Sequence, residues 1–85
     1  MDTPTAQPSV EIFSTPTCHF CQLSTEFFDA HNVQYTNHDV STDLVQRQAM
    51  IEMTGQMGVP VIKIGNDIVI GFDKEKLGEL LHISA

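Results

Sequence analysis

The chain has 85 residues, of which 41% are hydrophobic, so we expect one small domain with a single core. Eleven acidic residues against four basic ones give a formal charge of −7, which opposes binding to nucleic acid or to an anionic membrane surface. No hydrophobic run reaches the roughly 18 residues of a membrane span, and the first residues show no secretory signal, so we expect a cytoplasmic protein.

The first half of the chain reads as a tail followed by a strand, a helix and a second strand. Residues 1–9 contain two prolines and no periodicity, and we expect a flexible tail before a single domain at 10–85. A short hydrophobic strand is predicted at 10–13. Hydrophobic residues at helical spacing then predict a helix over 21–32, and a second strand is expected at 34–39.

A second helix is predicted from Thr42 to the helix breaker Gly55. Ser41 or Thr42 is the expected N-cap, because a hydroxyl oxygen can accept a hydrogen bond from a free N–H group of the first turn. The hydrophobic stripe expected to pack this helix comprises Leu44, Val45, Ala49, Met50, Met53 and Met57.

The last third of the chain predicts a hairpin and a short helix. Two β-rich runs at 59–64 and 68–70 flank a Gly65-Asn66-Asp67 turn, and Asp73 is placed to cap a helix with inward-facing leucines. The order β-α-β-α-β-β-α predicts an α/β fold with a four-stranded mixed sheet and helices on both faces. Cys18 then lies where the first strand ends and a helix begins, which is where open α/β sheets bind ligands.

Cys18 and Cys21 form a C-x-x-C pair that is open to three interpretations. A structural disulfide explains it poorly, because a bridge that closes so short a loop removes little entropy from the unfolded chain. A metal site would have to recruit ligands from His19, His31, His38 and His82, and His31 lies at the far end of the first helix. A redox-active dithiol is the interpretation we favour.

Three motifs together resemble the glutaredoxin branch of the thioredoxin superfamily. They are CHFC at 18–21, TGQMGVP at 54–60 and IGFD at 70–73, and the resemblance covers about residues 10–82. It implies a thioredoxin-like fold and a thiol-disulfide oxidoreductase with a redox-active centre. The Gly71-Phe72 pair, in place of the common double glycine, looks more like the glutaredoxin-like redoxins that donate electrons to ribonucleotide reductase and accept them from thioredoxin reductase.

The expected mechanism assigns different roles to the two cysteines. The helix N-terminus favours a negative sulfur, so Cys18 is predicted to attack the substrate disulfide as a thiolate and form a mixed disulfide. Cys21, one turn further and more buried, would displace the product and leave a Cys18–Cys21 bridge. His19 could favour the thiolate when protonated, or it could be an ordinary exposed histidine.

The remaining candidate residues are expected to contact substrate. Phe20 is either an exposed docking surface or the first residue of the core stripe, and we favour docking. The resemblance implies a cis Val59-Pro60 bond that presents the Val59 backbone to an extended substrate. Gly71, Phe72 and Asp73 would offer a helix N-terminus to a carboxylate such as that of a γ-glutamyl group, unless Gly71 only turns the chain and Asp73 only caps.

We expect no tightly bound cofactor and a monomer. Disulfide-containing proteins are the expected substrates, with glutathione or thioredoxin reductase as the electron donor. Few cationic residues are available for the two carboxylates of glutathione, and Met57 stands where glutathione users often have a basic or polar residue. The alternative function is an iron–sulfur or metal-binding glutaredoxin-like protein that uses Cys18, with a cluster shared between two chains.

Overall fold

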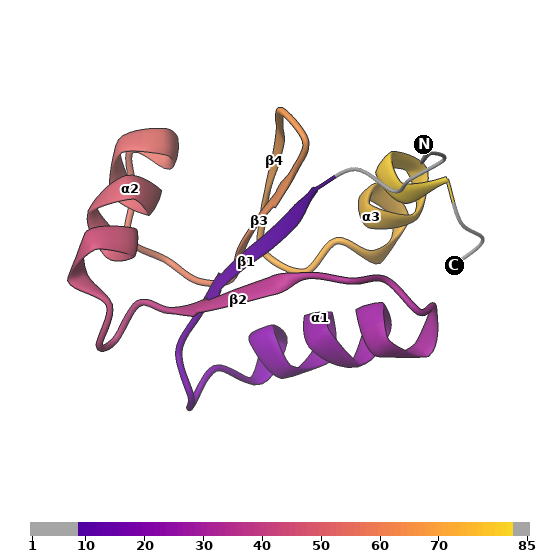
Figure 1. The fold of residues 1–85 in the computed structure, drawn as a ribbon, viewed down its shortest axis with the longest axis horizontal. Helices are drawn as coiled ribbons and strands as arrows, with labels where there is room; N and C mark the ends of the chain where they lie inside the picture. Colours follow the sequence, from indigo (N-terminus) through magenta and orange to yellow (C-terminus); the bar gives the residue numbers. More distant parts are fainter. Residues whose placement is uncertain (1–8, 83–85) are drawn as a thin grey trace, which may run out of the picture.

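The computed structural model describes residues 9–82 and confirms the predicted order of elements (Figure 1). These are β1 (Val10–Ser14), α1 (His19–Ala30), β2 (Thr36–Asp39), α2 (Leu44–Thr54), β3 (Val61–Ile64), β4 (Asp67–Ile70) and α3 (Lys74–Leu81). Residues 1–8 of the predicted tail lie outside the described residues. Ser9 is described, and its carbonyl oxygen accepts a hydrogen bond from the Gly65 N–H at 2.8 Å.

The strands form one mixed sheet in the order β2-β1-β3-β4. β1 and β2 run parallel, whereas β3 is antiparallel to β1 and β4 is antiparallel to β3. The predicted hairpin therefore supplies the antiparallel edge. Its turn is tighter than predicted, because Asp67 already belongs to β4 and pairs with Ile64, which leaves Gly65 and Asn66 as the turn. Gly65 has a φ of +60°, which suits a glycine at the first turn position.

Helices cover both faces of the sheet, as predicted. Side chains from α1 and α3 pack on one face, and Met50 of α2 packs on the other. In Figure 1, α2 stands at the opposite end of the molecule from α3. The larger core cluster contains Val10, Ile12, Phe27, Phe28, Val33, Ile62, Ile64, Val69, Leu77 and Leu81, and the smaller contains Phe13, Val40, Met50 and Val61.

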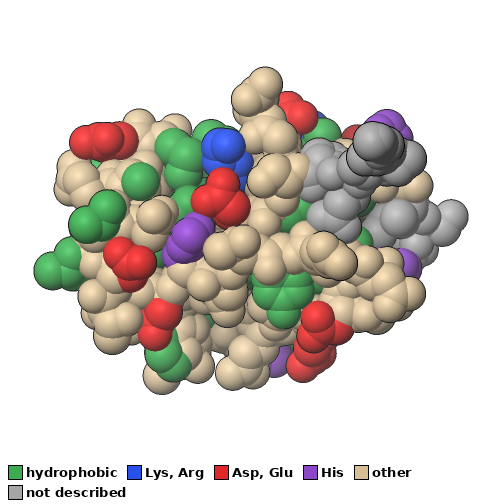
Figure 2. Space-filling model, viewed as in Figure 1, with side chains coloured by type: hydrophobic (Ala, Val, Ile, Leu, Met, Phe, Trp, Pro, Cys, Tyr) green, Lys and Arg blue, Asp and Glu red, His purple; other side chains and the backbone are tan. Residues whose placement is uncertain are grey.

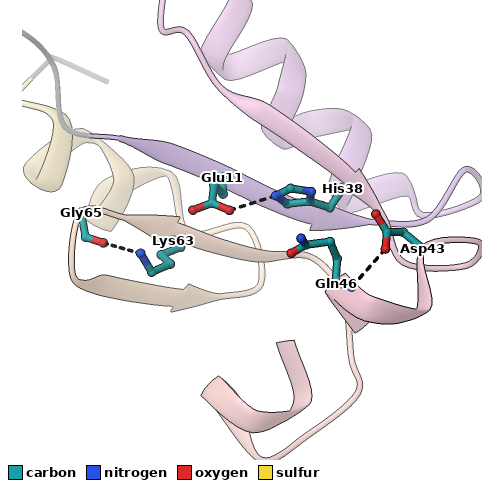
Figure 3. A network of polar contacts seen from close by, with 6 residues as sticks. All are labelled: Glu11, His38, Asp43, Gln46, Lys63 and Gly65. Atoms are coloured by element: carbon teal, nitrogen blue, oxygen red, sulfur yellow. Dashed lines mark hydrogen bonds and ion pairs between the residues drawn. The ribbon is translucent and has the colours of Figure 1, made fainter. Parts of the chain in front are cut away.

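The sheet face toward α2 also carries polar contacts (Figure 3). His38 Nε2 lies 2.9 Å from Glu11 Oε1, and its ring packs against Phe13 with the ring centres 5.0 Å apart. On the same face, Lys63 Nζ donates to the Gly65 carbonyl oxygen at 3.0 Å. The α2 face thus combines a small hydrophobic cluster with paired polar side chains from three strands.

The predicted start of the second helix was wrong. Asp43 caps α2 by accepting the Gln46 N–H at 3.1 Å, so the helix starts at Leu44 and not at Thr42. Ser41 instead donates its N–H and its hydroxyl to Asp39 Oδ1. Ser, Thr and Asp are all good N-cap residues, and the turn around Asp39 leaves Asp43 in the capping position.

The predicted hydrophobic stripe of this helix was wrong in part. Met53 packs against the smaller core cluster beside Met50, as predicted, and Ala49 is half-buried. Only Met50 is fully buried, whereas the side chains of Leu44 and Val45 are 64% and 76% exposed. Met57 lies beyond the helix and is exposed as well. Figure 2 shows hydrophobic side chains gathered at the surface on the α2 side of the molecule. Because α2 contacts the sheet along one narrow side of the helix, hydrophobic residues spread around a wider part of its surface cannot all be buried.

The starts of three other elements also differ from the predictions. α1 begins at His19, two positions before the predicted start, and β3 begins at Val61, after the Val59-Pro60 bond. β2 starts at Thr36 instead of residue 34. Within residues 9–82, the helices are too short, and too polar along their length, for any of them to cross a membrane.

Candidate active site

Cys18 occupies the N-cap position of α1, directly after the loop that leaves β1. Its backbone is extended, with φ −85° and ψ 113°, and its N–H donates to the Thr15 carbonyl oxygen at 3.2 Å. The Sγ atom accepts the N–H of Cys21 at 3.1 Å. Cys18 is partly exposed, so a substrate can reach a sulfur that already receives a backbone hydrogen bond.

Cys21 lies one helical turn inside α1, and its side chain is 3% exposed. Burial raises the pKa of its thiol to about 12, and a hydrogen bond and charge repulsion from Cys18 act in the same direction. A backbone hydrogen bond from Thr15 partly opposes the rise in pKa. The two sulfurs therefore differ in their access to solvent, and Cys21 remains a protonated thiol at neutral pH.

The Val59-Pro60 bond is cis, as the sequence resemblance implied. Pro60 is buried, Val59 is half-buried, and the Pro60 carbonyl oxygen accepts the N–H of Gly71 at 2.8 Å. This bond ties the loop before β3 to the segment after β4. The two predicted substrate-contacting segments are thus directly connected.

A second feature of this loop was not anticipated from the sequence. The Gln56 side chain bonds both backbone groups of Gly58: its Oε1 accepts the Gly58 N–H at 2.6 Å and its Nε2 donates to the Gly58 carbonyl oxygen at 3.1 Å. The Thr54 hydroxyl in turn contacts the backbone of Gln56. The Gln56 side chain therefore fills the space beside Gly58 where a Cβ would lie.

The three residues at 71–73 have structural roles in a turn, in the core and at the start of α3. Gly71 has a φ of +89°, which only glycine adopts without strain. Phe72 packs against the larger core cluster, with its ring centre 6.1 Å from that of Phe27. Asp73 caps α3 by accepting the Lys76 N–H at 3.1 Å. Turning and capping are therefore observed, and carboxylate binding here stays a prediction.

Phe20 is exposed rather than buried in the core, with 57% of its surface accessible. Its ring meets the edge of the neighbouring His19 ring at 5.6 Å between ring centres. His19 is exposed too. The exposure of Phe20 agrees with the docking interpretation and rules out its place in the core stripe.

A polar pocket of about 240 Å³ lies beside Cys21, and the sequence did not reveal it. Its walls come from the end of β1 and the following loop, from α1 and from β2. Ser14 Oγ donates to Asn37 Oδ1 at 2.6 Å within this wall. Alternation along β2 could have placed Asn37 and Asp39 on one face, but their position below Cys21 requires knowledge of the parallel pairing. The lining residues are Ser14, Thr15, Pro16, Cys21, Gln22, Thr25, Asn37 and Asp39.

The histidines considered as metal ligands are separated in the fold. His38 pairs with Glu11, and the His31 ring packs against Phe27 at 4.6 Å between ring centres. In the part of the chain that the structure describes, no three His, Cys, Asp or Glu side chains gather in a way that could hold a metal ion.

The chain resembles known proteins over most of its length. The model of the glutaredoxin family matches residues 10–69. A glutaredoxin-like 8.6 kDa protein from the rubredoxin operon of Clostridium pasteurianum is 35% identical over 73 residues, which is 86% of this chain and 97% of that protein.

Solved structures agree with this match. The thioredoxin-like protein BC3987 has a TM-score of 0.81 at 32% identity, with 86% of this chain and all of that chain covered. The NrdH-redoxin of Escherichia coli, at 17% identity, shows the fold alone, with a TM-score of 0.78 over 91% of this chain and 99% of that one. The fold is thioredoxin-like, and the chain belongs to the glutaredoxin family.

Proposed function

We propose that this protein reduces disulfides, either within proteins or between a protein and glutathione, through the Cys18–Cys21 dithiol. The observation that carries this is the pairing of an accessible sulfur at the N-cap of α1 with a buried thiol one turn inside the helix. The cis Val59-Pro60 segment supports the same function as a platform for an extended substrate, since exposed backbone can pair with an added strand.

The reaction takes place in two exchanges. The Cys18 thiolate attacks one substrate sulfur, the substrate S–S bond breaks, and the departing thiolate takes up a proton from water. The Cys21 sulfur then attacks Cys18 Sγ, and the second substrate sulfur leaves as a thiol. The substrate gains two electrons and two protons, and the protein is left with a Cys18–Cys21 bridge, which an external donor must reduce.

We propose thioredoxin reductase as the preferred donor, with glutathione as the alternative. Lys63 donates one hydrogen bond to the Gly65 carbonyl oxygen at the turn between β3 and β4. Phe72 and Asp73 are used in packing and capping. The chain has only four Lys and Arg residues in all, which are few for the two carboxylates of glutathione. The E. coli NrdH-redoxin, which shares the fold, is described as having a thioredoxin-like activity profile.

The test is the rate at which the oxidised protein is reduced in two NADPH-driven systems. One contains glutathione and glutathione reductase, and the other contains thioredoxin reductase. Faster NADPH consumption with thioredoxin reductase supports the proposed donor, and a preference for glutathione overturns it. Reduction by neither system, together with a visible absorbance band in the purified protein, would favour the alternative of a bound iron–sulfur cluster.

We further propose that the protein works in the cytoplasm as a monomer and without a tightly bound cofactor. The reducing cytosol suits a dithiol that must be returned to its thiol form after each turnover.

A further inference from the structure

The segment between α2 and β3 is hydrogen-bonded on both sides of Val59 but not at Val59 itself. Before it, the Gly58 N–H and carbonyl oxygen both bond to the Gln56 side chain. After it, the Pro60 carbonyl oxygen accepts the Gly71 N–H at 2.8 Å. In the part of the chain that the structure describes, the N–H and the carbonyl oxygen of Val59 have no hydrogen-bond partner. Backbone polar groups are usually paired, so these two are available to an added strand.

Val59 lies at the end of the sheet that leads to Cys18. Phe13, near the end of β1, pairs with Val61 at the start of the antiparallel strand β3, so β1 ends where β3 begins. The loop that leads to Cys18 and the segment that contains Val59 therefore leave the sheet at the same end. An extended peptide whose disulfide reacts at Cys18 is thereby brought toward the free backbone groups of Val59.

The Gln56 side chain takes the place of a neighbouring strand beside Gly58. Its Oε1 accepts the Gly58 N–H at 2.6 Å, and its Nε2 donates to the carbonyl oxygen of the same residue at 3.1 Å. Two residues that face each other in an antiparallel sheet exchange the same pair of bonds. Because both polar groups of Gly58 are bonded to one planar amide, the backbone that leads into Val59 is held in one orientation.

The residues around this contact are suited to it. The Gln56 backbone is fixed to the end of α2, where the Thr54 hydroxyl accepts the Gln56 N–H at 3.3 Å and lies 3.0 Å from the Gln56 carbonyl oxygen. The same hydroxyl lies 2.8 Å from the carbonyl oxygen of the buried Met50. A Cβ at Gly58 would come within 2.7 Å of Gln56 Oε1, so the amide approaches this closely only because the residue is glycine. A chain of contacts therefore connects α2 to the backbone before Val59.

We propose that Gln56 is a positioning residue for peptide substrates: its amide holds Gly58 so that the N–H and carbonyl oxygen of Val59 can pair with an extended backbone. The ligand is a polypeptide with a free N–H beside its disulfide, recognised by its backbone and not by its side chains. In this role Gln56 touches neither the substrate nor a reacting sulfur. Its loss should therefore weaken substrate binding and leave the rate of sulfur exchange unchanged, since a loop that is ordered in advance binds with a smaller loss of entropy.

This role rests on the disulfide exchange proposed above, so the experiment measures binding and chemistry separately. The probe is a short peptide that carries a fluorophore and whose cysteine forms a disulfide with a thiol bearing a quencher. The reduced protein, in excess, is mixed with the probe in a stopped-flow instrument, and the rise in fluorescence reports cleavage of the disulfide. The dependence of the rate on protein concentration gives a half-saturation constant and a maximal rate.

Two further probes show whether the substrate backbone matters. One is the same peptide with N-methyl groups on the amides that flank the disulfide, which cannot donate to the Val59 carbonyl oxygen. The other is the aryl disulfide DTNB, which has no peptide backbone. In the wild type, N-methylation should raise the half-saturation constant about tenfold, because it removes a hydrogen bond and places a methyl group against the acceptor.

Gln56→Ala should raise the half-saturation constant of the unmethylated peptide about fivefold, with the maximal rate unchanged. The N-methylated peptide and DTNB should react with this variant as they do with the wild type. Gly58→Ala, which displaces the amide without removing it, should give the same pattern. The matched control is Gln48→Ala, which should match the wild type, because Gln48 is an exposed glutamine of α2 whose amide bonds Glu52.

The assignment is wrong if the half-saturation constant of the unmethylated peptide is the same in Gln56→Ala as in the wild type, or lower, since a lower value would show that the amide blocks the site. Equal slowing of Gln56→Ala with the peptide and with DTNB would show a general structural role. Equal binding of both peptides by the wild type would remove Val59 from substrate recognition. Failure of the wild type to react with DTNB or with either peptide would instead refute the proposed exchange function itself.

Discussion

The N–H of Cys21 donates a hydrogen bond to Cys18 Sγ across 3.1 Å, so the predicted nucleophile is also the N-cap of α1. The same sulfur therefore has a structural role and a chemical one. A negative sulfur accepts this bond more strongly than a neutral one, since charge-assisted hydrogen bonds are stronger. Substitution at Cys18 can separate the two roles.

Replacing Cys18 by serine or by alanine should abolish disulfide reduction in both cases, because neither side chain can attack a sulfur. The stability of the two variants should differ. Serine is a good N-cap, whereas alanine loses the cap at a cost of about 1 kcal/mol in the free energy of unfolding. Urea unfolding under reducing conditions measures this difference. Equal stability of the two variants would show that the Sγ contact contributes nothing to the helix.

Cys21→Ser should preserve the activities that need one thiol and abolish those that need two. Removal of glutathione from a glutathionylated protein requires only the Cys18 sulfur and should persist. Reduction of a disulfide within a protein should be lost, because the mixed disulfide has no second thiol to release it. Parallel assays with the two substrate types test this, and retained reduction of protein disulfides would contradict the assigned role of Cys21.

The raised pKa of Cys21 predicts how stability depends on pH. The thiol titrates near 9 in its ordinary state and near 12 in the folded protein, so the folded state binds its proton more tightly. The resulting stabilisation is fully present below about pH 9 and is lost as pH rises through about 12. The free energy of unfolding of the wild type relative to Cys21→Ser should therefore fall between about pH 9 and pH 12.

This comparison is made with a reducing agent present throughout. Tyr35 also has a raised pKa, from burial and the nearby Asp29, but it is common to both proteins and cancels in the difference. A difference in unfolding free energy that stays constant over this range would contradict the predicted burial of the Cys21 thiol.

Gly58→Ala should loosen the loop before Pro60 through its effect on Gln56. An added Cβ would lie 2.7 Å from Gln56 Oε1, so that flexible side chain has to move and give up its two bonds to the Gly58 backbone. We expect a loss of about 1 kcal/mol in the free energy of unfolding, because these bonds are exposed. Thermal unfolding of the variant measures this loss.

The matched control is the double-mutant cycle with Gln56→Ala. In that background the added methyl group meets no side chain, so Gly58→Ala should have little further effect. Additive losses in the double variant would show that the effect of alanine at position 58 does not depend on Gln56.

Substitutions in α2 should affect stability according to burial and not according to hydrophobicity. Met50→Ala removes a side chain that is 1% exposed and should lower the free energy of unfolding by about 2 to 5 kcal/mol. Leu44→Ser and Val45→Ser change exposed side chains and should each alter it by less than about 0.5 kcal/mol. Chemical denaturation measures the free energy of unfolding of the three variants. A large decrease for Leu44→Ser would show that Leu44 is buried, as the sequence pattern predicted.

The sequence predicted the parts of the fold that depend on local rules. The order of elements, the Asp73 cap and the hairpin around Gly65 all follow from residue preferences within a few positions. The cis Val59-Pro60 bond followed from the family resemblance and not from such rules. The position of Cys18 at a helix start followed from the strand before it and the periodicity after it.

The errors and omissions have tertiary causes. The cap of α2 was misplaced because Ser41, which could serve as a cap, is used instead to hold the Asp39 carboxylate. Leu44, Val45 and Met57 were wrongly assigned to the buried stripe of α2 because the extent of a helix–sheet contact depends on packing distance and angle, which the periodicity of the sequence does not contain. The pocket below Cys21 was missed because Ser14 and Asp39 meet only through the β1–β2 pairing.

The position of β1 between β2 and β3 has a consequence for the order in which the protein is made. Both cysteines leave the ribosome before Pro60 does, and a bridge between them would close a loop so short that it needs no completed sheet. The Val59-Pro60 segment, which leads into β3, is positioned only after β3 has paired with β1. If the proposed function holds, a nascent chain carries both thiols before the proposed substrate platform is in place. Reactivity would then be encoded locally, and selectivity would be acquired only when synthesis of the sheet is complete.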